Sequence, residues 1–402
     1  MFENPWWGKD AWERNSQPVS TLECQKKDGC NDLESLNLGA MTPQLNNSNM
    51  KLNEKVSRLR KMRKAKSKKV IFNKLNKTKE RKARRELLSK VSKGKIEQFL
   101  RKLPRKDESY LYTKPSERRL TDEQIWLNVD WSKIQTHVFR IQCEIYSKTL
   151  NGENKSIRKL QNQLINDPWV KMLAVRRTTS DALGKKTAGI DGIACLDHKQ
   201  RIKLAATVTI DGTSGQIRRV WIPKPGTQEK RPLGIPNIVD RVKQNLLKIA
   251  LEPEWEAKFE DNAIGFRPGR KPADAIRGIW NSLRSTRKWI LDTDIEKCFD
   301  KIDHKYLLKK TGLTKNSLMY KQIKAWLEAA VIEVGNPYLA QQDRGTPQGG
   351  VISPLLANIA LSGIIEHTTK AVEDKYGKQA ARKYMHMYVY ADDFVILAQK
   401  KE

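Results

Sequence analysis

The chain has 402 residues, and its 77 Lys and Arg outnumber 46 Asp and Glu, which gives a formal net charge of +31. A charge of this size favours a polyanionic partner, and nucleic acid is the commonest one. No stretch approaches the roughly 18 uncharged apolar residues that a transmembrane helix needs. The first residues also lack the charged-then-apolar pattern of a secretion signal, so we expect a protein that is neither membrane-spanning nor secreted.

The cysteines point to a reducing compartment. There are five of them, widely spread, and none forms a C-x-x-C pair: Cys24, Cys30, Cys143, Cys195 and Cys298. An odd, scattered set argues against a disulfide scaffold and against a zinc site.

The N-terminal third is polar and then strongly basic. Residues 1–50 are rich in Asn, and we assign them no role. Residues 51–119 form a basic arm or linker, since 51–106 alone hold 24 Lys and Arg against four Glu. Charges this dense predict a disordered or weakly helical segment. Such an arm could bind the RNA backbone in a salt-dependent way, or it could be a solvated tail or targeting segment. The RNA-binding interpretation rests on basic residues such as Arg60, Lys61, Arg63 and Lys64.

Helical patterns dominate residues 120–200. Thr121 and Gln124 have the spacing of a capping box, which predicts a helix start. Apolar residues recur every three or four positions over 132–149, typical of an amphipathic helix, and again from Ile157 to Ile165. After Gly184, short apolar runs alternate with Gly and Pro, which favours an α+β fold for residues 201–402.

Acidic residues end two strand-like runs. Two β-rich runs flank Ala391, Asp392 and Asp393, which predicts a hairpin with two acids at its tip. Another apolar run leads to Asp292 and Asp294. Carboxylates on neighbouring strands can bind the two divalent ions that phosphoryl transfer to a 3′-hydroxyl requires. Because side chains alternate along a strand, we expect only one of the two adjacent acids to point fully into the site.

Three loops add nucleotide-binding chemistry. Residues 344–350 (RGTPQGG) begin with Arg344 and run into a helix start, with Ser353 expected as its cap. In 220–236, a basic turn between two extended runs could place an ammonium and a guanidinium on a triphosphate. Residues 265–270 (GFRPGR) form a basic turn suited to RNA phosphates, through Arg267 and Arg270. Taken alone, each loop is more often a structural turn, but together with the acids they form a combination that chance explains poorly.

In chain order, the motifs read IPKPG and KRPLGIP, GFRPGR, DIEKCFD, RGTPQGGVISPLLANIAL, and YADDFVIL. Together they resemble the reverse transcriptase of group II intron-encoded proteins, with wording similar to the chloroplast-like class of bacteria and organelles. TAGIDG at 187–192, together with KLQNQLI and AVRR further upstream, fits the N-terminal extension of that family. The resemblance covers about residues 125–402.

The resemblance implies a right-hand polymerase with fingers and palm, preceded by a helical extension over 120–200. It also implies an RNA-directed DNA polymerase that uses an intron RNA template, a primer, dNTPs and two Mg²⁺ ions. Asp294, Asp392 and Asp393 would be the catalytic, metal-binding acids, joined by the backbone carbonyl of Ile295. The nucleotide would contact Lys224, Arg231, Phe299, Gln348 and Gly349, with Phe299 as the gate against a 2′-hydroxyl. Phe299 could equally be a core residue.

The chain stops nine residues after Asp393. We therefore expect an incomplete palm and no thumb. Two alternatives stay open: an RNA-binding remnant without chemistry, and one half of a split enzyme whose thumb comes from another polypeptide. A plastid or a bacterial cytoplasm fits the resemblance best as the compartment.

Overall fold

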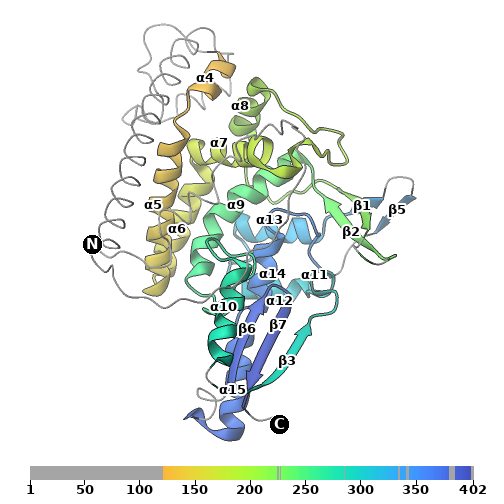
Figure 1. Ribbon diagram of the computed structural model, residues 1–402. Helices are drawn as coiled ribbons and strands as arrows, with labels where there is room; N and C mark the ends of the chain where they lie inside the picture. The colour runs from red at the N-terminus through yellow and green to blue at the C-terminus, as the bar shows by residue number, and fades with distance from the viewer. Residues whose placement is uncertain are drawn as a thin grey trace, which may run out of the picture.

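The computed structural model describes residues 121–399, apart from 224–225, 227, 285, 334–335, 341–343 and 380–384. The expectations for residues 1–119, including the basic arm, and for Lys224 lie outside the described residues. Within them, helices predominate and strands form two separate sheets (Figure 1). No described helix combines the length and apolar character needed to cross a bilayer.

The N-terminal described part is helical. Its elements are α4 (Asp122–Asn128), α5 (Trp131–Leu150), α6 (Asn154–Asn166), α7 (Pro168–Arg176), a π-helical turn (Arg177–Asp181), a 3₁₀ turn (Leu183–Lys186) and α8 (His198–Thr207). The helices predicted over 132–149 and from Ile157 are confirmed as α5 and α6. The capping box at Thr121 is confirmed as well, because its side chain accepts the Gln124 amide while the Gln124 side chain accepts the Thr121 amide.

The remaining elements alternate between strands and helices. They are β1 (Ile217–Pro223), β2 (Lys230–Ile235), α9 (Ile238–Glu256), α10 (Pro272–Leu283), β3 (Trp289–Asp294), α11 (Cys298–Lys301), α12 (His304–Lys310), α13 (Leu318–Leu327), β4 (Val331–Glu333), β5 (Asn336–Ala340), α14 (Ser353–Leu361), α15 (Ile364–Tyr376), β6 (Met385–Tyr390) and β7 (Asp393–Ala398). Helix α14 begins one residue earlier than expected. Ser353 lies in its first turn rather than at its cap, and its hydroxyl donates to the Pro347 carbonyl.

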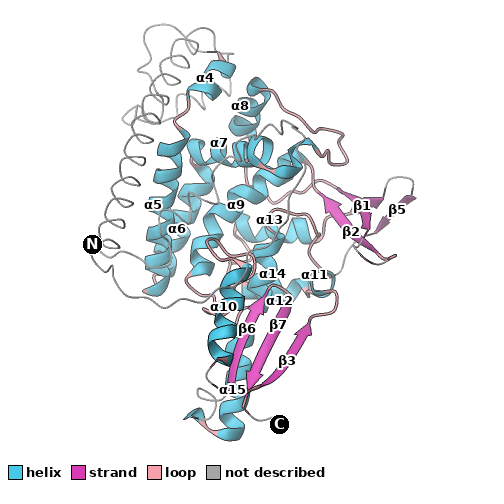
Figure 2. Ribbon diagram, viewed as in Figure 1, coloured by secondary structure: helices cyan, strands magenta, loops and turns pink. Residues whose placement is uncertain are grey.

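The two sheets differ in strand order and in strand direction (Figure 2). In the first, the strand order is β2-β1-β4-β5, with β1 antiparallel to β2 and parallel to β4. In the second, the order is β3-β7-β6 and all pairs are antiparallel. Helices α10 and α15 pack against β6 of this second sheet. The mixed helix and sheet content confirms the α+β fingers and palm expected from the sequence.

One buried cluster joins the helical N-terminal part to the rest of the molecule. It runs from Ile125 to Ile359 and includes side chains of α5, α6, α7, α12, α13 and α14. Helix α9 lies at its centre, because α5, α6 and α7 all pack against it and most of its residues are buried. Full burial of each large apolar side chain stabilises the fold by about 1.5–3 kcal/mol.

A buried ionic network reinforces this junction. The Glu254 carboxylate of α9 is 0% exposed and accepts hydrogen bonds from Arg158 at 2.6 Å and Gln161 at 2.7 Å, both on α6. Lys258 is a third donor residue, at 2.6 Å. Burial works to raise the pKa of Glu254, but Arg158 and Lys258 outweigh it, so the pKa lies below its usual value. The network therefore holds α6 on α9 with an ionised carboxylate.

Candidate active site

The acids of the two strand ends meet in the second sheet. In the pairing of β3 with β7, Asp294 lies directly opposite Asp393. Directly opposed residues of antiparallel strands share one face, so the two carboxylates project to the same side. Asp292, two residues earlier on β3, belongs to that face as well. The hairpin predicted from sequence is confirmed, with Ala391 and Asp392 as its turn.

The turn is held against the start of the next segment. The Ile295 amide donates to the Asp392 carbonyl at 3.0 Å, so β3 and the turn stay in register beyond the last strand pair. Asp392 itself is half-buried, whereas Asp294 and Asp393 are exposed. Solvent can therefore reach both opposed acids.

The carboxylates repel one another. Partial burial raises the pKa of the Asp393 carboxyl, and three nearby carboxylates raise it further: those of Asp392, Asp294 and Asp292. The same charge reaches Cys298, whose pKa is raised to about 11, mainly by burial and then by Asp392. Concentrated negative charge of this kind is relieved by binding a cation.

The resemblance stated above implies that these carboxylates hold Mg²⁺ ions. Carboxylate oxygens are the ligands that Mg²⁺ prefers, so the donor type fits. Over the described ranges, however, no group of three or more His, Cys, Asp or Glu side chains is arranged to hold a metal ion. The carbonyl of Ile295, expected as a further ligand, accepts the Cys298 amide at 3.1 Å. The structure places Asp292, Asp294 and Asp393 on one face of the sheet, with Asp392 in the adjoining turn.

The GFRPGR segment and the residues just before it pack against β6 and the Ala391–Asp392 turn. Ile264 donates its amide to the Val389 carbonyl at 2.8 Å, which adds a short extra rung beside β6. Gly265 lies against the backbone of the turn, because a Cβ on it would be 2.8 Å from the Tyr390 carbonyl carbon and 3.1 Å from the Ala391 Cα. Ala391 has φ +60°, a left-handed conformation that is strained for a residue with a side chain.

Arg267 has a different role from the RNA contact expected from sequence. It is 7% exposed, and its guanidinium binds Glu256 through Nε at 2.9 Å and through Nη2 at 3.0 Å. Its Nη1 donates to the carbonyls of Glu260 at 2.7 Å and Ala263 at 2.6 Å. A guanidinium enclosed in this way is not presented to a nucleic acid. Arg270, three residues on, is half-buried.

The RGTPQGG loop packs against the segment that follows Asp294. The Thr346 amide donates to the Phe299 carbonyl at 2.7 Å. A Cβ on Gly345 would lie 2.8 Å from both the Phe299 and the Asp300 carbonyl oxygens, and the residue has φ +89°. This glycine is thus required by the contact between two protein backbones. Arg344, at the start of the loop, is exposed.

The far end of the same loop contacts the β1–β2 hairpin. The Gly234 amide of β2 donates to the Gln348 carbonyl at 2.5 Å, and a Cβ on Gly349 would be 2.9 Å from the Leu233 side chain. Arg231 lies two residues before Leu233, so it projects from the same face of the hairpin. The loop therefore contacts the Phe299 backbone through Thr346 and the β1–β2 hairpin through Gln348 and Gly349. Arg231 is exposed on that hairpin.

Phe299 has a setting that suits either of its two interpretations. It is half-buried on α11 and packs edge-on against Phe266, with ring centroids 6.1 Å apart and an interplanar angle of 78°. It lies five residues after Asp294 and also borders the main apolar cluster. The ring therefore makes a structural contact with Phe266, and its chain position five residues after Asp294 is the one that the gate interpretation expects.

Sequence reasoning missed the residues that hold the turn from behind. Glu256, Asn358 and Gly265 form this support, since the Asn358 amide on α14 donates to the Gly265 carbonyl at 2.8 Å. The sequence signal for this support is the spacing of Glu256 and Arg267. That spacing does not distinguish an internal ion pair from two solvated charges.

Comparison with known proteins agrees with this geometry. A family model described as "Reverse transcriptase (RNA-dependent DNA polymerase)" matches residues 222–402, and one described as "N-terminal domain of reverse transcriptase" matches 126–208. Protein YkfC of Escherichia coli (strain K12) is 32% identical over 279 residues, which are 60% of this chain and 71% of that protein.

Two further relatives carry intron-related names. Group II intron-encoded protein LtrA of Lactococcus lactis subsp. cremoris is 38% identical over 182 residues, 44% of this chain and 30% of LtrA. Maturase-like protein 1 of Euglena gracilis is 27% identical over 253 residues, 59% of this chain and 51% of that protein. The chain thus spans 71% of YkfC but only 30% of LtrA and 51% of Maturase-like protein 1. The motifs, the two family models and these relatives agree: the chain belongs to the reverse transcriptase family, and its relatives include proteins encoded by group II introns.

Proposed function

We propose that the chain is an RNA-directed DNA polymerase, which adds dNTPs to a primer 3′ end on an RNA template in the service of a group II intron. The observation that carries this proposal is the register of β3 and β7, which sets Asp294 opposite Asp393 beside a turn that carries Asp392. Three carboxylates at one strand end are the donors that nucleotidyl transfer requires.

The acids are proposed to hold two Mg²⁺ ions, for which their donor type is suited. When bound, such ions activate the attacking 3′-hydroxyl and stabilise the leaving pyrophosphate. The chain's own contribution is to keep Asp294 and the turn in fixed register, through the strand pairing and the bond from Ile295 to Asp392. Preorganised placement of this kind costs no rearrangement at the moment of reaction.

The nucleotide is proposed to lie between the loop 344–350 and the β1–β2 hairpin. Arg231 and Lys224 would bind the triphosphate, with Arg231 exposed on the face that meets the loop. Gln348 and Gly349 would line the pocket floor. The Phe299 ring would lie against C2′ of the sugar and exclude a 2′-hydroxyl.

RNA contacts and cellular context are further parts of the proposal. The basic arm (with Arg60, Lys61, Arg63 and Lys64), Arg270 and Arg344 would bind phosphates of the template and intron RNA, since the chain carries +31 net charge. We propose that the chain belongs to the chloroplast-like class and works in a plastid or in a bacterial cytoplasm. A separate polypeptide that supplies a thumb is a proposed partner.

The test is primer extension on an RNA template by the purified chain, with and without a supplied C-terminal part. Asp294→Asn and Asp392→Asn should abolish extension and leave RNA affinity unchanged, whereas Asp374→Asn, at an exposed position on α15, should extend normally. Extension that persists in both active-site variants would refute the metal-ligand assignment. RNA binding without extension under any condition would favour an RNA-binding protein without chemistry.

A further inference from the structure

The buried Arg267 stands at the centre of a contact network behind the acids. Its guanidinium spans two elements, because it binds the Glu256 carboxylate at the end of α9 and the carbonyls of Glu260 and Ala263 in the following loop. It also lies over the Phe259 ring, 5.4 Å from the centroid. One side chain thus fixes the path of the loop that begins where α9 ends.

This loop bears directly on the catalytic turn. The Val389 amide donates to the Asn262 carbonyl at 2.9 Å, and the Val389 carbonyl accepts the Ile264 amide at 2.8 Å. The loop then passes so close to Tyr390 and Ala391 that only a glycine fits, at position 265. The position of the turn therefore depends on the path of the loop, and the path of the loop depends on the hydrogen bonds of Arg267.

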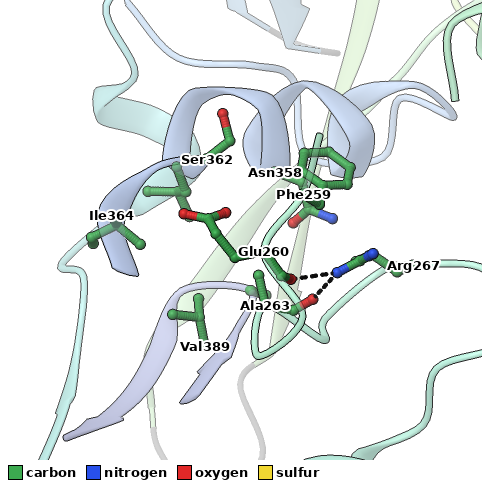
Figure 3. A pocket seen from close by; sticks show the side chains of 10 residues that line it. Phe259, Glu260, Ala263, Arg267, Asn358, Ser362, Ile364 and Val389 are labelled. Atoms are coloured by element: carbon green, nitrogen blue, oxygen red, sulfur yellow. Dashed lines mark hydrogen bonds between the residues drawn. The ribbon is translucent and has the colours of Figure 1, made fainter. Parts of the chain in front are cut away.

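A small cavity lies behind the turn (Figure 3). It is lined by Phe259, Glu260, Arg267, Asn358, Val389 and Ala391, among others. In the close-up, Arg267 reaches the carbonyls of Glu260 and Ala263 at one side of this space, and Val389 of β6 lies at another. The cavity lies beside the contact of Gly265 with Ala391, and the hydrogen bonds of Arg267 run along its wall.

We propose that Arg267 is a positioning residue, which sets the place of the Ala391–Asp392 turn and thereby the alignment of Asp392 with Asp294. The inference rests on the proposed function, since alignment matters only if the acids act together. It assigns to the arginine of the GFRPGR segment a task inside the protein instead of a contact with RNA. Arg267 acts through the backbone carbonyls of Glu260 and Ala263 and through Gly265.

The test compares Arg267→Gln with Arg277→Gln, which removes the same charge from an exposed position on α10. Arg267→Gln should lower the single-turnover extension rate by about 10- to 100-fold, because a misplacement of about 1 Å costs about that much. It should leave RNA affinity and its salt dependence unchanged. Arg277→Gln should change none of these. An altered salt slope without a slower reaction would overturn the proposal and restore the RNA contact.

A second variant separates positioning from loss of folding. Arg267→Gln alone leaves the buried Glu256 charge without its partner, which destabilises a fold strongly. The double variant Glu256→Gln/Arg267→Gln removes that charge, so it should melt near the wild-type temperature and still extend slowly. Wild-type extension by the double variant would refute the role of the carbonyl contacts.

Hydrogen exchange gives a readout that does not depend on activity. In both variants the amides of Ile264 and Val389 should exchange about tenfold faster than in the wild type, whereas those of β3 should not change. Unchanged exchange at these two amides would overturn the inference even if extension were slow. If the wild type extends no primer at all, the proposed function fails, while faster exchange in the variants would still establish the support of the turn.

Discussion

Gly265→Ala should displace the Ala391–Asp392 turn while leaving the rest of the fold in place. The added methyl group would lie 2.8 Å from the Tyr390 carbonyl carbon and 3.1 Å from the Ala391 Cα, and closer still to the Ala391 nitrogen. All three are backbone atoms, so no side chain can rotate away. Restoring ordinary contact requires a movement of about 1 Å between the loop and the turn. Misplacement of reacting groups by that amount lowers a rate by about 100-fold, or about 2.7 kcal/mol in the barrier.

The assay is single-turnover primer extension at saturating dNTP and template, accompanied by thermal unfolding. The overpacked loop should also cost about 1–3 kcal/mol of stability, so extension is measured well below the melting temperature. Gly184→Ala is the matched control, because no atom lies within 4 Å of its added Cβ and its φ is not in the left-handed region. An extension rate for Gly265→Ala within twofold of the control would refute the view that the loop dictates the position of the turn.

Three further outcomes are expected. Phe299→Ala should relax the choice between dNTP and rNTP in primer extension, since the clash with a 2′-hydroxyl disappears; unchanged discrimination would make Phe299 a packing residue. Arg158→Met should destabilise the fold by about 3 kcal/mol in chemical denaturation. It should also move acid unfolding to higher pH. The lowered pKa of Glu254 contributes stability above the pKa of the carboxyl in the unfolded chain, and this stability is lost as the pH falls through its pKa in the folded chain. An unchanged midpoint of acid unfolding would contradict the role of the network. Deletion of 51–106 should flatten the salt dependence of RNA affinity, and an unchanged slope would make the arm a spacer.

Local pattern was sufficient to predict the acidic face. Two strand-like runs that end in Asp294 and Asp393 can pair antiparallel, and strand alternation then places both side chains on one side. The helices α5 and α6 followed in the same way from apolar spacing. These features depend on periods of two and 3.6 residues, which are written in the chain itself.

Contacts between distant segments could not be predicted in this way. The parallel pairing of β1 with β4 joins Ile217 to Val331 across more than a hundred residues, and no local signal announces it. The glycines at 265 and 345 each accommodate another stretch of backbone, a contact that no local pattern predicts. Arg267 looked like a phosphate contact because burial depends on the whole fold and not on the neighbouring residues.

The central position of α9 has a consequence for engineering this protein. The two regions recognised by separate family models contribute side chains to one continuous interior, and the Arg158–Glu254 bond crosses their junction. Cutting the chain at that junction would expose the apolar face of α9 to solvent. It would also remove the Arg158 partner of the Glu254 carboxylate. Chimeras between relatives should therefore exchange the helical extension and the polymerase part together, because each part covers apolar side chains of the other.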